Sequence, residues 1–174
     1  MLLLSAALAA PLSMAPADGQ IGFRASASLH DFDGRAESFT GAFDPAAGVG
    51  QLVIPVVGLR TGLGPRDSRM QEFALDRLHF PEVRLSVDRV SGTLDALRAG
   101  QGGGTLNMAG TLTIRDVSRP ISVPATFAWE GEALRLTGAL PLRWTDWGVP
   151  DASTVLSTLG PELTITFDVL GRPE

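Results

Sequence analysis

Residues 83–88, Val-Arg-Leu-Ser-Val-Asp, decide the fold of this 174-residue chain. Apolar and polar side chains alternate strictly there, and a period of two is the pattern of a β-strand with one buried face and one solvated face. The same period recurs on both sides of this stretch, between turns rich in glycine, proline and aspartate. The predicted strands span residues 21–29, 39–43, 52–56, 83–87, 106–114, 121–127, 134–144 and 163–169.

Eight short strands at regular spacing predict an all-β domain, either a sandwich or a barrel. Each strand has one apolar face, so these faces must meet in a shared interior, and closing the sheet removes edges that would otherwise aggregate. We therefore expect an eight-stranded antiparallel β-barrel. The interior of a barrel of this size is either filled by side chains or holds one small ligand, and the strand pattern leaves both outcomes open.

One segment, residues 65–78, departs from the strand pattern. Met70, Phe73 and Ala74 fall at helical spacing, the segment begins with a proline, and Pro81 follows it as a stop signal. The pattern predicts one short amphipathic helix inserted in the all-β chain. Such a helix can cap one end of the barrel or pack on its outer wall.

Composition excludes several classes of function. The chain has no cysteine, which removes thiol nucleophiles, disulfides, iron–sulfur clusters and cysteine-type zinc sites. The net charge is −5 and the basic residues do not cluster, which argues against nucleic-acid binding. His30 lies beside Asp31 and Asp33, but neighbouring residues on a strand-to-turn segment point in different directions. We predict a solvated turn there and no metal site.

The N-terminus is typical of a targeting segment. Residues 1–17 form an apolar run, and both Ala7-Leu8-Ala9 and Ala15-Pro16-Ala17 match the A-x-A cleavage pattern. The run is too short to span a membrane. We expect a signal peptide in residues 1–17, a single barrel domain in residues 18–174, and a periplasmic protein.

Catalytic patterns are scarce. No serine lies in a Gly-x-Ser-x-Gly elbow, and the glycine triplet 102–104 lacks the Lys-Ser/Thr and the helix of a phosphate loop, so we predict a hairpin loop there. Asp146 and Asp151 could form an acid–base pair, but nothing in the sequence fixes their distance. No catalytic residue and no cofactor is predicted. Trp144 and Trp147, near a strand end, could line a cavity mouth or fill the core.

Five stretches of the sequence carry a recognisable pattern when taken together. They are Gly34-Arg35-Ala36-Glu37-Ser38-Phe39-Thr40-Gly41-Ala42-Phe43-Asp44-Pro45, Leu59-Arg60-Thr61-Gly62 with Arg66-Asp67-Ser68-Arg69-Met70, His79-Phe80-Pro81-Glu82-Val83-Arg84-Leu85, Gly110-Thr111-Leu112-Thr113-Ile114-Arg115-Asp116-Val117-Ser118-Arg119-Pro120-Ile121, and Thr145-Asp146-Trp147-Gly148-Val149. Together they resemble the YceI-like family of lipocalin-like, polyisoprenoid-binding periplasmic proteins. Asp116 stands where the family has glycine, and Arg69 stands where many members carry histidine. The family's Trp-x-x-Asp-x-x-His-Ser opening of the first strand is not recognisable.

The resemblance implies a lipocalin-like barrel whose interior takes the tail of an isoprenoid quinone or polyprenyl lipid, as a periplasmic carrier or store. It supplies no catalytic residues. Strand parity adds a set of inward-facing residues as candidate ligand contacts, although a slip of one residue in register would turn them all outward. The candidates are Phe23, Phe39, Phe43, Leu85, Leu112, Phe127, Trp144 and Phe167.

Two other interpretations remain open from the sequence. A barrel packed solid would act through its outer surface as a stress-related interaction protein. An enzyme on the same scaffold would use Asp146 or His30, and would need polar residues clustered inside the barrel. A homodimer is compatible with each interpretation.

Overall fold

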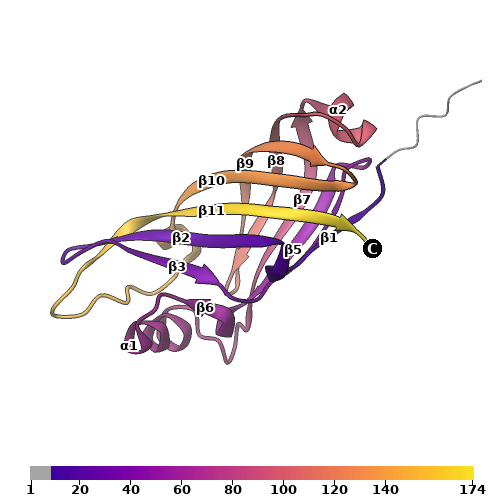
Figure 1. The fold of residues 1–174 in the computed structure, drawn as a ribbon. Coiled ribbons are helices and arrows are strands. Elements are labelled where there is room, and N and C mark those ends of the chain that lie inside the picture. The colour runs from indigo at the N-terminus through magenta and orange to yellow at the C-terminus, as the bar shows by residue number, and fades with distance from the viewer. Residues whose placement is uncertain (1–8) are drawn as a thin grey trace, which may run out of the picture.

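The computed structural model describes residues 9–174 of the chain as one antiparallel sheet with short helices between its strands (Figure 1). The strands are β1 (Leu12–Met14), β2 (Gly19–Ala27), β3 (Phe32–Ala36), β4 (Thr40–Asp44), β5 (Val49–Pro55), β6 (Leu59–Arg60), β7 (Glu82–Gly92), β8 (Gly103–Ile114), β9 (Val117–Glu130), β10 (Ala133–Arg143) and β11 (Leu159–Pro173). The helical segments are η1 (Pro16–Asp18), η2 (Val56–Gly58), α1 (Gly64–Ser68), η3 (Arg69–Ala74), α2 (Leu94–Ala99) and η4 (Trp144–Trp147). No helix in residues 9–174 is long and apolar enough to cross a membrane.

The wall of the barrel has eight strand positions, because three pairs of the eleven segments each build one interrupted strand. β1 and β2 both pair with β11 on one side, and they pair with β4 and β3 on the other. β3 and β4 in turn pair with β6 and β5, which the short helix η2 separates. β5 pairs with β7, and the wall then follows chain order to β11. The predicted eight-stranded antiparallel barrel is confirmed.

Three short strands are absent from the sequence prediction. β1 lies inside the predicted targeting segment, β3 begins in the segment predicted as a solvated turn, and β6 has only two residues. β1 and β6 are too short to show an alternating pattern of their own, whereas Phe32, Gly34 and Ala36 of β3 do alternate with polar residues and were a usable signal. Each is held in the wall by neighbouring strands rather than by local propensity.

The helix prediction is correct in place but not in extent. The helical segment runs from Gly64 through the π-helical turn η3 and ends at Ala74, several residues before Pro81. The backbone of Asp76 is in the left-handed region (φ 50°), which stops the helix, and its carbonyl accepts the N–H of Phe80 at 2.8 Å. Proline is therefore not the residue that ends this helix.

The glycine triplet does not form the predicted hairpin loop. Gly103 and Gly104 belong to β8, whereas the link from β7 is made by a second helix, α2, which was not predicted. Its Leu97 is completely buried in the core. Figure 1 shows α1 and α2 at opposite ends of the barrel, so both ends carry a helix.

The wall opens locally between β9 and β10, whose pairing stops at Ala125 and Gly138. Pro124, the next residue of β9, has no N–H to continue the ladder. Trp147 of η4 fills this gap: it is 4% exposed, and its indole N–H donates to the carbonyl of Leu112 at 2.9 Å. Trp147 is thus a filler of the barrel wall.

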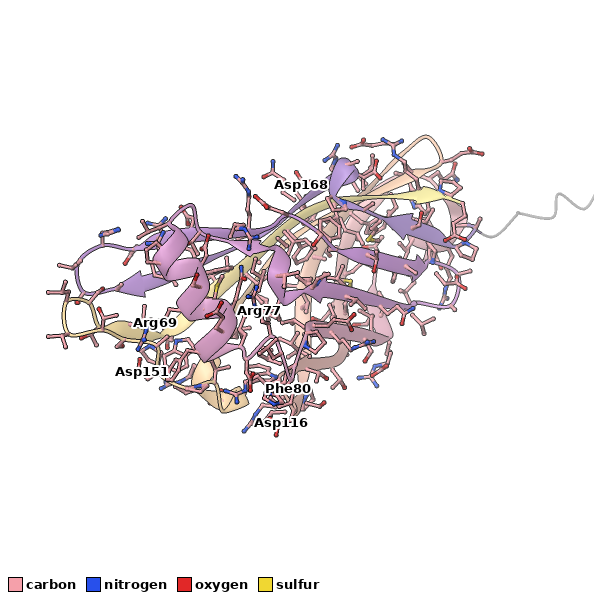
Figure 2. All side chains as sticks on the ribbon, turned by 90° about the horizontal axis from the view of Figure 1, so that it is seen from below. Arg69, Arg77, Phe80, Asp116, Asp151 and Asp168 are labelled. Atoms are coloured by element: carbon pink, nitrogen blue, oxygen red, sulfur yellow. The ribbon has the colours of Figure 1, made fainter. Side chains whose placement is uncertain are left out.

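The turn between β8 and β9 explains why glycine is not needed at Asp116. The residue in the left-handed region is Arg115 (φ 55°), whereas Asp116 has an ordinary negative φ and lies exposed at the tip (Figure 2). Arg115 is tied down by a hydrogen bond to the carbonyl of Ala74 at 3.2 Å and by its stacking on Phe80.

Candidate ligand cavity

The barrel is hollow at the end where α1 lies. An open cavity of about 670 Å³ extends into the interior from this end. Its wall is almost entirely apolar and is contributed by β2, β5, β10, β11, the helical segment and the loop from residue 149 to residue 158. A barrel packed solid with side chains is therefore not what this sequence forms.

The helical segment closes part of this end of the barrel, which decides between the two predicted placements. Met70, Ala74 and Leu75 line the cavity at the α1 end of the barrel, so the helical segment caps the barrel rather than covering its outer wall. Two buried polar side chains hold it in place: the Gln71 amide donates to the carbonyl of Leu59 at 2.8 Å, and the Asp67 carboxylate accepts the backbone N–H and the hydroxyl of Thr61.

Arg66 and Arg69 line the cavity near its opening, and both are fixed by protein partners. The guanidinium of Arg66 donates to the hydroxyl and the carbonyl of Thr61, and lies 4.1 Å from the centre of the Phe32 ring. Arg69 donates to the carbonyls of Ala152 and Ser153 at 2.6 and 3.0 Å. Arg69 thereby ties the helix to the loop that forms the opposite lip of the opening.

The same loop is stiffened by Asp151, which lies near Arg69 in Figure 2. Its carboxylate accepts the hydroxyl and the backbone N–H of Ser153 at 2.5 and 2.9 Å. These two hydrogen bonds stabilise the charged form and lower the pKa of Asp151, and the positive charge of Arg69 adds to this effect. Asp151 is thus a structural residue of the lip.

A second, smaller chamber of about 140 Å³ lies deeper in the barrel, towards β1 and β4, and its wall is almost entirely apolar. Four branched side chains line both spaces and form the partition between them, namely Ile21, Ile54, Val83 and Ile165. Two phenylalanines lie over glycines of the neighbouring strand, where a Cβ atom would clash with the ring: Phe23 over Gly34, and Phe167 over Gly138. These glycines let the rings lie flat against the wall, which leaves the interior free.

The eight candidate contacts divide into three groups. Phe23 and Trp144 line the main cavity, and the indole N–H of Trp144 is satisfied by the carbonyl of Gly160 at 2.7 Å. A second group lines the deeper chamber: Phe43, Leu85, Leu112 and Phe167. Phe39 and Phe127 are each 2% exposed in the packed core and line neither space.

Strand parity missed the cavity residues that are not on strands. These come from the helix and from the loop before β11, and they include Arg66, Met70, Leu75, Val149 and Leu156. The apolar stripe of the helix was a usable signal for Met70 and Leu75. No periodicity marks the loop residues, which reach the cavity only because the chain folds back there.

The polar residues considered for catalysis or metal binding do not converge. His30 is exposed at the rim of the cavity, and Asp146 is exposed on η4, where its carbonyl accepts the Arg119 guanidinium. Within residues 9–174 no group of three or more His, Asp or Glu side chains is placed to hold a metal ion.

The sequence matches the model of the YceI-like domain over residues 13–170. The chain belongs to the YceI-like family. This is a family of binding barrels, and the match covers every strand of the wall apart from the first residue of β1 and the end of β11. Comparison with curated protein sequences gives no significant match.

Solved structures of the same fold support this assignment. A polyisoprenoid-binding domain from Saccharophagus degradans, implicated in plant cell wall breakdown, superimposes with a TM-score of 0.81 at 18% identity, covering 97% of this chain and 100% of that one. BcnA of Burkholderia cenocepacia gives 0.75 at 21% identity, with coverages of 89% and 97%. The YceI protein of Campylobacter jejuni gives 0.64 at 18% identity, with coverages of 81% and 85%.

Proposed function

We propose that this chain is a periplasmic carrier or store of an isoprenoid lipid, either a quinone or a polyprenyl lipid, whose tail occupies the main cavity. The observation that carries the proposal is the open apolar cavity of about 670 Å³. Ligand pockets of roughly 300–1,000 Å³ enclose most of a small-molecule ligand. The Saccharophagus degradans relative is a polyisoprenoid-binding domain, which supports the ligand class.

The physical chemistry of the wall favours a tail over a polar ligand. Burying each methylene contributes about 0.8 kcal/mol, so a tail of several isoprene units offsets the cost of ordering and immobilising it. Three polar side chains of the cavity, those of Arg66, Arg69 and Trp144, are committed to protein partners. The cavity wall therefore offers apolar contacts to the tail, and these three polar side chains need no hydrogen-bond partner from the ligand. No catalytic residue is part of this proposal.

The test is extraction of the protein as it is produced in a bacterial host from the full 174-residue sequence. Native mass spectrometry of the purified protein, followed by organic extraction, is expected to show one isoprenoid quinone or polyprenyl lipid per chain. The mass of the extracted species distinguishes the two classes.

A matched pair of variants on β2 links retention to the cavity. Ala25 lines the cavity, and its neighbour Ser26 faces outward. Ala25→Trp fills the space and should lower lipid retention by about tenfold or more, because it displaces several methylenes of the tail. Ser26→Trp should retain lipid as the parent does. A protein that is empty and takes up no added isoprenoid, or equal retention by both variants, would overturn the proposal.

A further inference from the structure

The cavity opening is surrounded by apolar side chains that the fold itself does not use. Four of them form what we call the rim patch: Leu29, Leu63, Val155 and Leu156, with exposed fractions of 67%, 52%, 103% and 81%. They come from three separate segments, namely the β2–β3 turn, the link before α1 and the loop before β11. Leu29, Leu63 and Leu156 also line the cavity, so the patch is continuous with its apolar wall.

The loop before β11 presents its two apolar residues in a way that local folding does not require. Thr154 and Ser157 close a tight turn by exchanging backbone hydrogen bonds at 2.8 and 3.3 Å, which leaves Val155 and Leu156 at the two central positions. Turn positions are dominated by Gly, Pro, Asn, Asp and Ser, and neither Val155 nor Leu156 belongs to that set. Val155 is fully exposed, so no contact within the fold compensates for this choice. Exposed apolar side chains that neither the turn nor the core requires are expected at a functional site.

Hydrogen bonds fix the segments that carry the rim patch. The N–H of Ser28 donates to the carbonyl of Thr158 at 2.8 Å, and the N–H of Thr158 donates to the hydroxyl of Ser28 at 2.9 Å. These bonds hold the β2–β3 turn against the loop, and Figure 1 shows the two segments side by side at the end of the barrel away from α2. Arg69 fixes the other side of the loop to the helix.

We propose that the rim patch inserts into the surface of a phospholipid bilayer and places the cavity opening against the membrane, so that an isoprenoid tail passes between bilayer and barrel without crossing water. This inference rests on the proposed function. A second protein is a poorer fit, because stable protein interfaces take about 20–30 residues a side, whereas the patch consists of four side chains on three tips. A brief membrane contact is also what a carrier requires, since it must leave again.

The charges near the patch predict how the contact depends on lipid and salt. Asp31 and Asp151 lie in the same connections as the apolar tips, and Asp33 follows at the start of β3. The nearby Arg24, Arg66 and Arg69 are paired or hydrogen-bonded. Among residues 9–174, no unpaired basic cluster lies near the patch to attract anionic headgroups. Binding should therefore be driven by apolar insertion, should be similar for neutral and anionic vesicles, and should not weaken as salt is raised.

The experiment is flotation of the full chain with phosphatidylcholine vesicles, with and without anionic lipid and at two salt concentrations. The double variant Val155→Asp/Leu156→Asp should lower the bound fraction by about tenfold or more, because it removes two inserting side chains and adds two charges. Val49→Asp is the matched control: Val49 is also exposed (42%), but it lies at the β4–β5 turn and does not line the cavity. It should bind as the parent does.

Two further measurements separate the possible failures. Transfer of an isoprenoid quinone from loaded vesicles should slow in the double variant, whereas uptake of quinone added from ethanol should be unchanged, since the cavity is intact. Equal flotation of parent and double variant, or binding only to anionic vesicles with loss at high salt, would overturn the docking proposal. Sedimentation showing a dimer that the double variant abolishes, without vesicle binding, would assign the patch to a second copy. A parent that floats but takes up no quinone would instead refute the proposed function.

Discussion

Small changes in side-chain volume decide how much of this barrel is empty. Phe23 and Phe167 lie over glycines of the adjacent strand, and four branched residues at the partition divide the interior in two. The main cavity of about 670 Å³ and the deeper chamber of about 140 Å³ are therefore separated by side chains, not by backbone. The four partition side chains therefore determine how far a ligand can extend into the barrel.

This arrangement predicts that the partition limits the length of the bound tail. Ile54→Ala removes one of the four partition side chains and should let a longer isoprenoid tail enter the deeper chamber. Leu163→Ala is the control, because Leu163 lines only the main cavity. The readout is the distribution of tail lengths, by mass spectrometry, that each protein retains from a mixture of isoprenoid quinones. The same distribution in both variants would contradict a role for the partition.

The two variants should also differ little in stability, which keeps that comparison valid. Ile→Ala and Leu→Ala in a fully packed core cost about 2–5 kcal/mol. Ile54 and Leu163 face open space and are only partly buried, so each substitution should stay near the lower end of that range. Chemical unfolding of the lipid-free variants checks this expectation.

Strand parity could place residues inside the barrel but could not separate cavity from core. Phe23 and Phe127 have the same inward parity, yet Phe23 lines the main cavity and Phe127 is packed against other core side chains. Whether an inward residue meets a neighbour or empty space depends on where the two ends of the barrel are closed. Those closures are made by the helical segment, by α2, by β1 and by the loop before β11, and of these only the helical segment has a periodic signal in the sequence.

At the scale of elements, β1 is a strand of the wall that lies inside the predicted targeting segment. Leu12 is 2% exposed and Met14 is 9% exposed, in a strand that hydrogen-bonds to β4 on one side and to β11 on the other. Met14 also lines the deeper chamber. β1 therefore completes the first barrel strand, although it lies within the residues 1–17 predicted as a targeting segment.

We predict that an exported form of the chain is cleaved after Ala9 and not after Ala17. Both sites match the A-x-A pattern, but cleavage after Ala17 would remove β1 and leave the edge of β4 unpaired. Cleavage after Ala9 leaves β1 intact. The intact mass and N-terminal sequence of the exported protein decide the question, and a mature protein that begins at Asp18 would refute the prediction.

Two truncated proteins test the physical reason separately from the processing. A chain that begins at Ala10 should unfold as the parent does. A chain that begins at Asp18 loses the buried side chains of Leu12 and Met14, and its free energy of unfolding should fall by at least about 2–5 kcal/mol, the cost of one large-to-small core substitution. Equal stability of the two chains would show that β1 is not needed to close the barrel.

At the scale of the whole molecule, the two ends of the barrel differ in kind. The end with α2 and β1 contains the larger packed cluster of core side chains, including the fully buried Leu97 and Leu134. The end with α1 encloses the main cavity, and its closure depends on a few hydrogen bonds between the helix, the lip and the β2–β3 turn. Side-chain packing therefore stabilises the α2 end more than the α1 end. At the α1 end, contacts between the cavity wall and a bound ligand would add to the stability of the fold.

Removing the bound lipid should lower stability, and it should do so mainly at the hollow end. A ligand at 100 times its dissociation constant stabilises the folded state by about 2.7 kcal/mol. For a domain of this size each kcal/mol shifts Tm by roughly 2–4 °C, so the lipid-free protein should melt roughly 5–10 °C lower. Adding back the extracted lipid should restore the Tm of the parent and should not restore that of Ala25→Trp, whose cavity is filled. Amide hydrogen exchange should speed up in α1 and the lip but not in α2, because α1 and the lip line the cavity and α2 does not. A Tm that is unchanged on lipid removal, or faster exchange spread evenly over the barrel, would mean that the cavity is not where the lipid contributes to stability.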